Sequence, residues 1–199
     1  MDEQDKAVFL SYLKEYLLPK DEATLQDKLS NPNTSAREKA RTLRKLKLNN
    51  FSDEIILLCY CLMPNHFHFF IKQKSPNSID RFMQSLSTRY IMYFNKKYKR
   101  VGSLFQAVYK AVLVQNEEQF VYLSKYIHKQ AILMNYPSSY PDFVQKQKTE
   151  WVKPAEILNY FSNKTPSLTY KSFIQEEIEY ERLQNLLFDD SPDCFSFTR

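Results

Sequence analysis

The chain has 199 residues, of which 43% are hydrophobic and 15% aromatic, and its formal net charge is +5. This apolar content is sufficient for a folded core and excludes a chain that is disordered throughout. Three cysteines are too few for a disulfide framework, and there is no signal peptide or apolar run of membrane-spanning length, so we expect a bacterial-type cytoplasmic protein with no membrane partner.

The first segment of the chain is amphipathic. Apolar side chains recur at helical spacing between residues 3 and 18, and this pattern predicts a helix. A polar segment rich in turn-forming residues follows, and within it the stretch from Arg37 to Lys47 is strongly basic. We predict a solvated helix for this stretch, and an auxiliary contact with DNA is the alternative.

Two segments of strand length come next. Residues 55–63, "IILLCYCLM", form an apolar run that Pro64 ends, and "HFHFFIKQ" at 66–73 follows after a short turn. We predict that the two segments form an antiparallel pair. Cys59 and Cys61 lie inside the apolar run and are expected to be small core residues.

The rest of the chain alternates between helical and extended patterns. Residues 78–100 have the pattern of a long amphipathic helix with Asn77 or Ser78 as its N-cap. The segment 104–115, "LFQAVYKAVLVQ", is predicted to be a strand, and Asn116 is predicted to cap a helix over 117–134.

The order of these elements is helix, strand, strand, helix, strand, helix. It corresponds to an α+β fold with an antiparallel sheet of the ferredoxin or RRM type, in which the first strand is missing. We therefore expect one domain over residues 1–136 and a C-terminal helical extension over 137–199 that packs on it, with final helices within 168–188.

Two of the three histidines lie one residue apart in the stretch "CLMPNHFHFF". Side chains alternate along a strand, so His66 and His68 project to the same side, about 7 Å apart along the chain. Two neutral imidazoles at this spacing can bind one divalent metal ion. The alternative is a pair of half-exposed histidines with no ligand.

The segment 117–134 carries two stripes at helical spacing. The apolar stripe contains Phe120, Leu123, Ile127, Ala131 and Met134. The second stripe contains Tyr122, Tyr126 and Gln130, whereas His128 lies on another face. Tyr126 and Gln130 can thus approach one site together, as a phenol nucleophile and an amide ligand. Spacing alone does not select Tyr126 over Tyr122, and a packing role for the tyrosine is the alternative.

Three motifs in the same order resemble those of a known family. They are "LMPNHFHFFI", "FMQSLSTRYIMYFNKKYKRVGSLFQAVYKAVLV" and "YLSKYIHKQAI", between residues 55 and 135. Together they resemble the single-tyrosine HUH transposases of insertion-sequence type, especially the REP-associated tyrosine transposase branch.

This resemblance implies a role for each matching residue. His66, His68 and Gln130 would be ligands of Mg²⁺ or Mn²⁺, and Tyr126 would be the nucleophile that attacks a phosphodiester and forms a 5′-phosphotyrosine. The implied partner is single-stranded or hairpin DNA, and the implied localisation is the cytoplasm, in association with the nucleoid. Whether the protein acts as a monomer or as a homodimer is left open.

A basic run supports a DNA partner independently of the resemblance. Residues 81–116 contain no acidic residue. The predicted DNA contacts in this run are Arg89, Lys96, Lys97, Lys99, Arg100 and Lys110. Such contacts with phosphates give salt-sensitive and largely non-specific affinity. The alternative is an ordinary solvated helix end.

The chain departs from the family pattern at two places. The family normally opens with a central strand, whereas this chain begins inside a helix, so we expect either a truncated copy or a gap that another segment or subunit fills. Gln130 stands where the REP-associated branch usually has Asn-Pro. Two rival hypotheses are a catalytically inactive or domesticated DNA-binding relative, and a zinc-dependent hydrolase that uses His66, His68 and His128.

Overall fold

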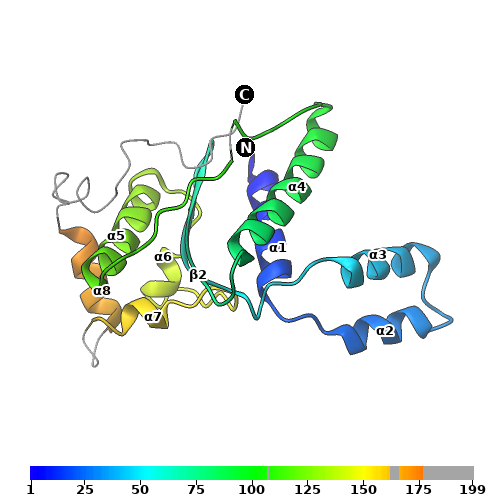
Figure 1. The fold of residues 1–199 in the computed structure, drawn as a ribbon, viewed down its shortest axis with the longest axis horizontal. Coiled ribbons are helices and arrows are strands. Elements are labelled where there is room, and N and C mark those ends of the chain that lie inside the picture. Colours follow the sequence, from blue (N-terminus) through cyan, green and yellow to red (C-terminus); the bar gives the residue numbers. More distant parts are fainter. Residues whose placement is uncertain (107, 162–165, 177–199) are drawn as a thin grey trace.

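A computed structural model of the protein describes residues 1–106, 108–161 and 166–176 (Figure 1). An antiparallel pair of strands, β1 (Ile55–Leu62) and β2 (Phe67–Gln73), lies between two groups of helices. Helices α1 (Glu3–Leu17) and α4 (Ser78–Tyr98) cover one face, and α5 (Glu117–Met134) covers the other. The predicted α+β class with an antiparallel sheet is confirmed.

The helix boundaries follow from local capping. The Asp2 side chain accepts a hydrogen bond from the Asp5 backbone N–H, and the Asp5 side chain accepts one from Asp2, so a reciprocal capping box starts α1. The Asn116 side chain accepts a hydrogen bond from the Gln119 N–H and starts α5. The predicted helices over 3–18, 78–100 and 117–134 are confirmed.

The hairpin has the register expected from its sequence. Cys61 lies opposite His68 and Leu62 opposite Phe67, with an irregularity between Leu57 and Cys59. Because successive side chains of a strand alternate between faces, the two strands contribute to a hydrophobic cluster on each side. The first cluster includes Phe9, Leu13, Leu57, Phe67, Phe82 and Tyr90; the second includes Leu58, Cys59, Cys61, Phe70, Ile127 and Tyr170.

The strand predicted for 104–115 is wrong. Within the described part of this segment only Phe105 forms an isolated bridge and no strand is present, and residues 108–115 run past β2 as an irregular segment. A strand requires a neighbour with which to pair, but a groove separates this segment from β2. The sequence pattern correctly indicated an apolar extended segment. Residues 108–115 do not become a strand because no other strand in the described part of the chain lies close enough to pair with them.

Two further helices, α2 (Glu22–Ser30) and α3 (Ala36–Lys47), form a hairpin that projects from the rest of the molecule (Figure 1). The helix predicted for the basic stretch from Arg37 to Lys47 is confirmed as α3. Helix α2 was not predicted from the sequence; it is polar and buries none of its residues.

After α5 the chain folds back over the second hydrophobic cluster. Helices α6 (Tyr140–Phe143), α7 (Ala155–Leu158) and α8 (Pro166–Gln175) surround α5 (Figure 1). Short bridges join Ser138 to Cys61 and Val152 to Leu57, along the edge of β1. The remainder of the helices predicted for 168–188 lies outside the described residues. No helix in the described ranges combines the length and the apolarity needed to cross a membrane.

Candidate active site

The two hairpin histidines lie side by side at the start of β2. The centroids of the His66 and His68 rings are 5.1 Å apart. The Nδ1 atom of His66 lies 2.8 Å from Oδ1 of Asn65. Because an amide oxygen only accepts hydrogen bonds, Nδ1 carries the proton and the lone pair of His66 is on Nε2.

Burial keeps the ring of His68 neutral. Burial, reinforced by the neighbouring His66, lowers the pKa of His68 to about 4, and a hydrogen bond with the Gln130 side chain opposes this shift. The Nε2 atom of His68 is buried and has no hydrogen-bond partner. A buried polar atom without a partner is costly, and a ligand that accepts its lone pair would remove this cost.

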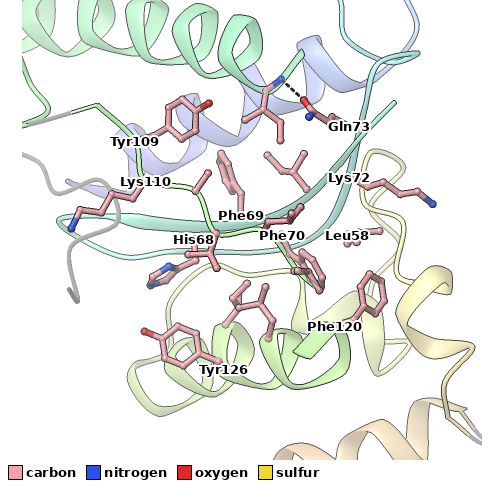
Figure 2. Close-up of a pocket in the computed structure, with 18 of the residues that line it drawn as sticks. Leu58, His68, Phe69, Phe70, Lys72, Gln73, Tyr109, Lys110, Phe120 and Tyr126 are labelled. Carbon is pink, nitrogen blue, oxygen red and sulfur yellow. Dashed lines mark hydrogen bonds between the residues drawn. The ribbon is translucent and has the colours of Figure 1, made fainter. Parts of the chain in front are cut away.

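Helix α5 brings a tyrosine to the same place. The centroid of the Tyr126 ring is 5.6 Å from that of His68, and the two rings are inclined at 70°. Figure 2 shows both side chains at one end of a pocket, with Tyr126 rising from α5 toward β2. Gln130 lies one turn further along α5, beside the His68 ring. Tyr122, one turn earlier, instead packs on Phe173 of α8, so the structure distinguishes the two tyrosines that the spacing did not.

His128 lies on another face of α5, as the helical phase predicted, and it is completely buried. Its Nδ1 is 2.7 Å from the Tyr170 hydroxyl and its Nε2 is 2.8 Å from the Ser139 hydroxyl. The Tyr170 hydroxyl donates to Ser124, at 3.2 Å, so it accepts from Nδ1–H of His128. Burial lowers the pKa of His128 to about 3. Since both of its ring nitrogens have hydrogen-bond partners, His128 does not fit the three-histidine zinc site.

The paired histidines fit a divalent metal ion. The site offers two imidazoles and the side-chain amide of Gln130, and the unpartnered Nε2 of His68 is the feature that a metal ion would satisfy. No cluster of three or more His, Cys, Asp or Glu side chains that could hold a metal ion occurs within the described ranges. The third donor of the candidate site is therefore an amide rather than a carboxylate.

Two of the predicted DNA contacts form ion pairs within the protein. Arg89 pairs with Glu15 and stacks on Tyr12, with its guanidinium carbon 3.7 Å from the ring centroid. Lys97 forms ion pairs with Asp2 and Asp5, at 2.6 and 2.7 Å. The run 81–116 lacks acidic residues, but α1 supplies these carboxylates across the interface between α1 and α4.

The remaining predicted contacts have more accessible side chains. Lys96, Lys99 and Lys110 are exposed, and Arg100 is half-buried beside the Phe94 ring. The surface of α4 is therefore less basic than its sequence suggests, because its partner helix neutralises part of the charge.

An apolar groove of about 520 Å³ runs along β2 between α4 and α5 (Figure 2). His68 and Tyr126 lie at one end of it, and Phe120 and Leu58 lie near the other. The segment 109–114 forms its outer wall. Neither the groove nor the hydrogen bonds of His128 with Ser139 and Tyr170 was predicted from the sequence, because both depend on contacts between distant segments.

The structure is an α+β protein in which the rings of His66, His68 and Tyr126 lie close together. Residues 33–130 match the sequence model of a family described as transposase, IS200 like. This match covers all four candidate site residues and supports the transposase family, although it does not distinguish the REP-associated branch. Comparisons with curated proteins and with solved structures gave no match.

Proposed function

We propose that the protein is a transposase that nicks and rejoins single-stranded or hairpin DNA through Tyr126. One observation carries this proposal. The Tyr126 ring lies 5.6 Å from the His68 ring, whose buried Nε2 has no hydrogen-bond partner. A nucleophile beside a metal-binding atom is the arrangement that metal-assisted phosphoryl transfer requires.

His66, His68 and Gln130 would hold Mg²⁺ or Mn²⁺. The chemistry that a bound ion would supply is polarisation of the scissile phosphate and compensation of the negative charge that develops on it. The low pKa of His68 keeps its ring neutral at physiological pH, so the lone pair needed for coordination is present. Gln130 adds a neutral donor, which leaves the positive charge of the ion available for the phosphate.

Tyr126 carries out the bond exchange. Its phenolic oxygen loses a proton to solvent and attacks phosphorus, the bond from phosphorus to the 3′-oxygen breaks, and that oxygen is protonated to give a 3′-hydroxyl. The product is a 5′-phosphotyrosine ester. Because one phosphate ester replaces another, a second 3′-hydroxyl can reverse the exchange and join strands without an external energy source.

A trapping assay tests this proposal. The substrate is a pool of 3′-labelled DNA hairpins with random single-stranded flanks, incubated with Mn²⁺ or Mg²⁺. We expect a covalent protein–DNA adduct on a denaturing gel for the unaltered protein and none for Tyr126→Phe. Tyr122→Phe is the matched control, since it removes the same atom one helical turn away, and should retain the adduct.

The alternative is a catalytically inactive DNA-binding relative. Absence of an adduct with the unaltered protein, in the presence of measurable hairpin binding, would favour this alternative. An adduct that persists in Tyr126→Phe would show that another residue is the nucleophile.

A further inference from the structure

The projecting hairpin of α2 and α3 contributes little to either hydrophobic cluster. Thr42 is the buried residue of α3, and α2 has none. Its surface is therefore available to a partner. Packing in the hydrophobic core therefore does not explain why the exposed residues of α3 are so basic.

Three arginines form a stripe along α3. Arg37, Arg41 and Arg44 are spaced i, i+4, i+7, so they lie within about 60° of one another around the helix. All three are exposed, and none has an ion pair with any described residue. The one acidic residue of α3, Glu38, is engaged at the helix start, where it accepts a hydrogen bond from Ser35 at 2.9 Å.

Two arginines of α4 differ from this arginine stripe. Arg89 pairs with Glu15, and Arg81 pairs with Glu54. These guanidinium groups therefore have anionic partners within the protein, whereas those of the arginine stripe are available for an external anion. The stripe spans about 10 Å on a straight helix, at 1.5 Å per residue.

We infer that α3 binds the phosphate backbone of double-stranded DNA through Arg37, Arg41 and Arg44. Guanidinium groups bind phosphate oxygens in a bidentate manner, and charge complementarity favours a polyanion. The choice of DNA among polyanions rests on the proposed function. A duplex segment beside the cleaved single strand, such as a hairpin stem, is the partner that this surface fits.

The composition of the hairpin favours duplex over single-stranded DNA. Proteins that bind single strands combine basic residues with aromatic side chains on which bases stack. Residues 20–50 contain no aromatic residue. A row of guanidinium groups along one face of a helix suits regularly spaced phosphates instead.

The experiment measures binding of a blunt DNA duplex and of an oligo-dT strand of equal length, by fluorescence anisotropy between 50 and 200 mM salt. The test variant combines Arg37→Gln, Arg41→Gln and Arg44→Gln. We expect its duplex affinity to fall at least tenfold and the slope of log K against log salt to decrease by about 2 to 3, because each phosphate contact contributes about 0.9. Its affinity for oligo-dT should change less than twofold.

Two control variants distinguish DNA binding by α3 from a general effect of positive charge on the protein surface. Replacing the same three arginines by lysine keeps the charge and should preserve most of the salt dependence. Replacing Lys146, Lys148 and Lys171 by glutamine removes the same charge from exposed positions outside α3. An equal loss of duplex affinity in this second control, or equal losses for duplex and oligo-dT in the arginine variant, would overturn the inference.

The outcome does not depend on the covalent adduct. Loss of duplex binding in the arginine variant supports the inference even where the unaltered protein forms no adduct. Conversely, an adduct formed by the unaltered protein together with undiminished duplex binding by the arginine variant would overturn the inference and leave the proposed function intact.

Discussion

Tyr170→Phe removes one buried oxygen atom and tests whether the hydrogen bonds of His128 stabilise the fold. The Tyr170 side chain is fully buried, so the phenyl ring of the variant occupies the same space and no cavity arises. The lost hydroxyl accepts from Nδ1–H of His128, at 2.7 Å, and donates to Ser124, at 3.2 Å.

The expected magnitude follows from the partners that remain. Ser124 keeps its hydrogen bond to the Val121 carbonyl, at 2.7 Å, and contributes little to the loss. Nδ1–H of His128 is left buried without an acceptor, which costs roughly 1–3 kcal/mol. We therefore expect the free energy of unfolding to fall by about 2 kcal/mol.

Urea unfolding followed by circular dichroism measures this loss. With a slope of about 2 kcal/mol per molar urea, the midpoint should fall by about 1 M while the slope stays constant. Tyr160→Phe is the matched control, because Tyr160 is half exposed and should change stability by less than about 0.5 kcal/mol. A Tyr170→Phe midpoint that coincides with that of the control would refute the reasoning.

Three further predictions concern protonation, thiols and assembly. The pKa of His128 is about 3 in the folded chain and about 6.5 in the unfolded chain, so the unfolded state binds more protons between these pH values. The free energy of unfolding should therefore fall by about 1.4 kcal/mol for each pH unit below pH 6.5. His128→Gln should flatten this pH dependence when unfolding is measured at decreasing pH. Burial raises the pKa of the Cys61 thiol to about 12 and that of the Cys59 thiol well above its usual range. In a Cys194→Ser background, a thiol reagent at pH 8 should therefore modify neither cysteine until urea unfolds the chain. Rapid labelling of the folded protein would contradict this prediction. His68 and Tyr126 approach each other within one chain, so a mixture of His68→Ala and Tyr126→Phe proteins should form no DNA adduct, whereas restored adduct formation would show that subunits share their sites.

The sequence predicted the features that depend on local periodicity. The apolar run 55–63 and the short turn after it identified the hairpin, and the helical phase of α5 correctly placed His128 away from Tyr126. Such patterns are sufficient because each element selects its own buried face. The outcome for Tyr122 and Tyr126 required the structure, since only packing against Phe173 or His68 distinguishes them.

The features that the sequence did not reveal are contacts between distant segments. The pairing of Lys97 with Asp2 spans 95 positions, and that of His128 with Tyr170 spans 42. The missing third strand within the described part of 104–115 has the same origin, because an apolar extended segment becomes a strand only beside a partner. Composition within 81–116 could not show that α1 neutralises part of its charge.

The hairpin of β1 and β2 lies between the two hydrophobic clusters and contributes side chains to both. A two-stranded hairpin is marginal in water by itself, so its persistence depends on the helices on both sides. We therefore expect the two hydrophobic clusters to unfold together, and heating should give a single calorimetric transition. The positions of His66 and His68 at the end of the hairpin therefore depend on packing on both sides of it. A destabilising substitution in the cluster beneath α1 should also disturb the arrangement of these histidines with Tyr126.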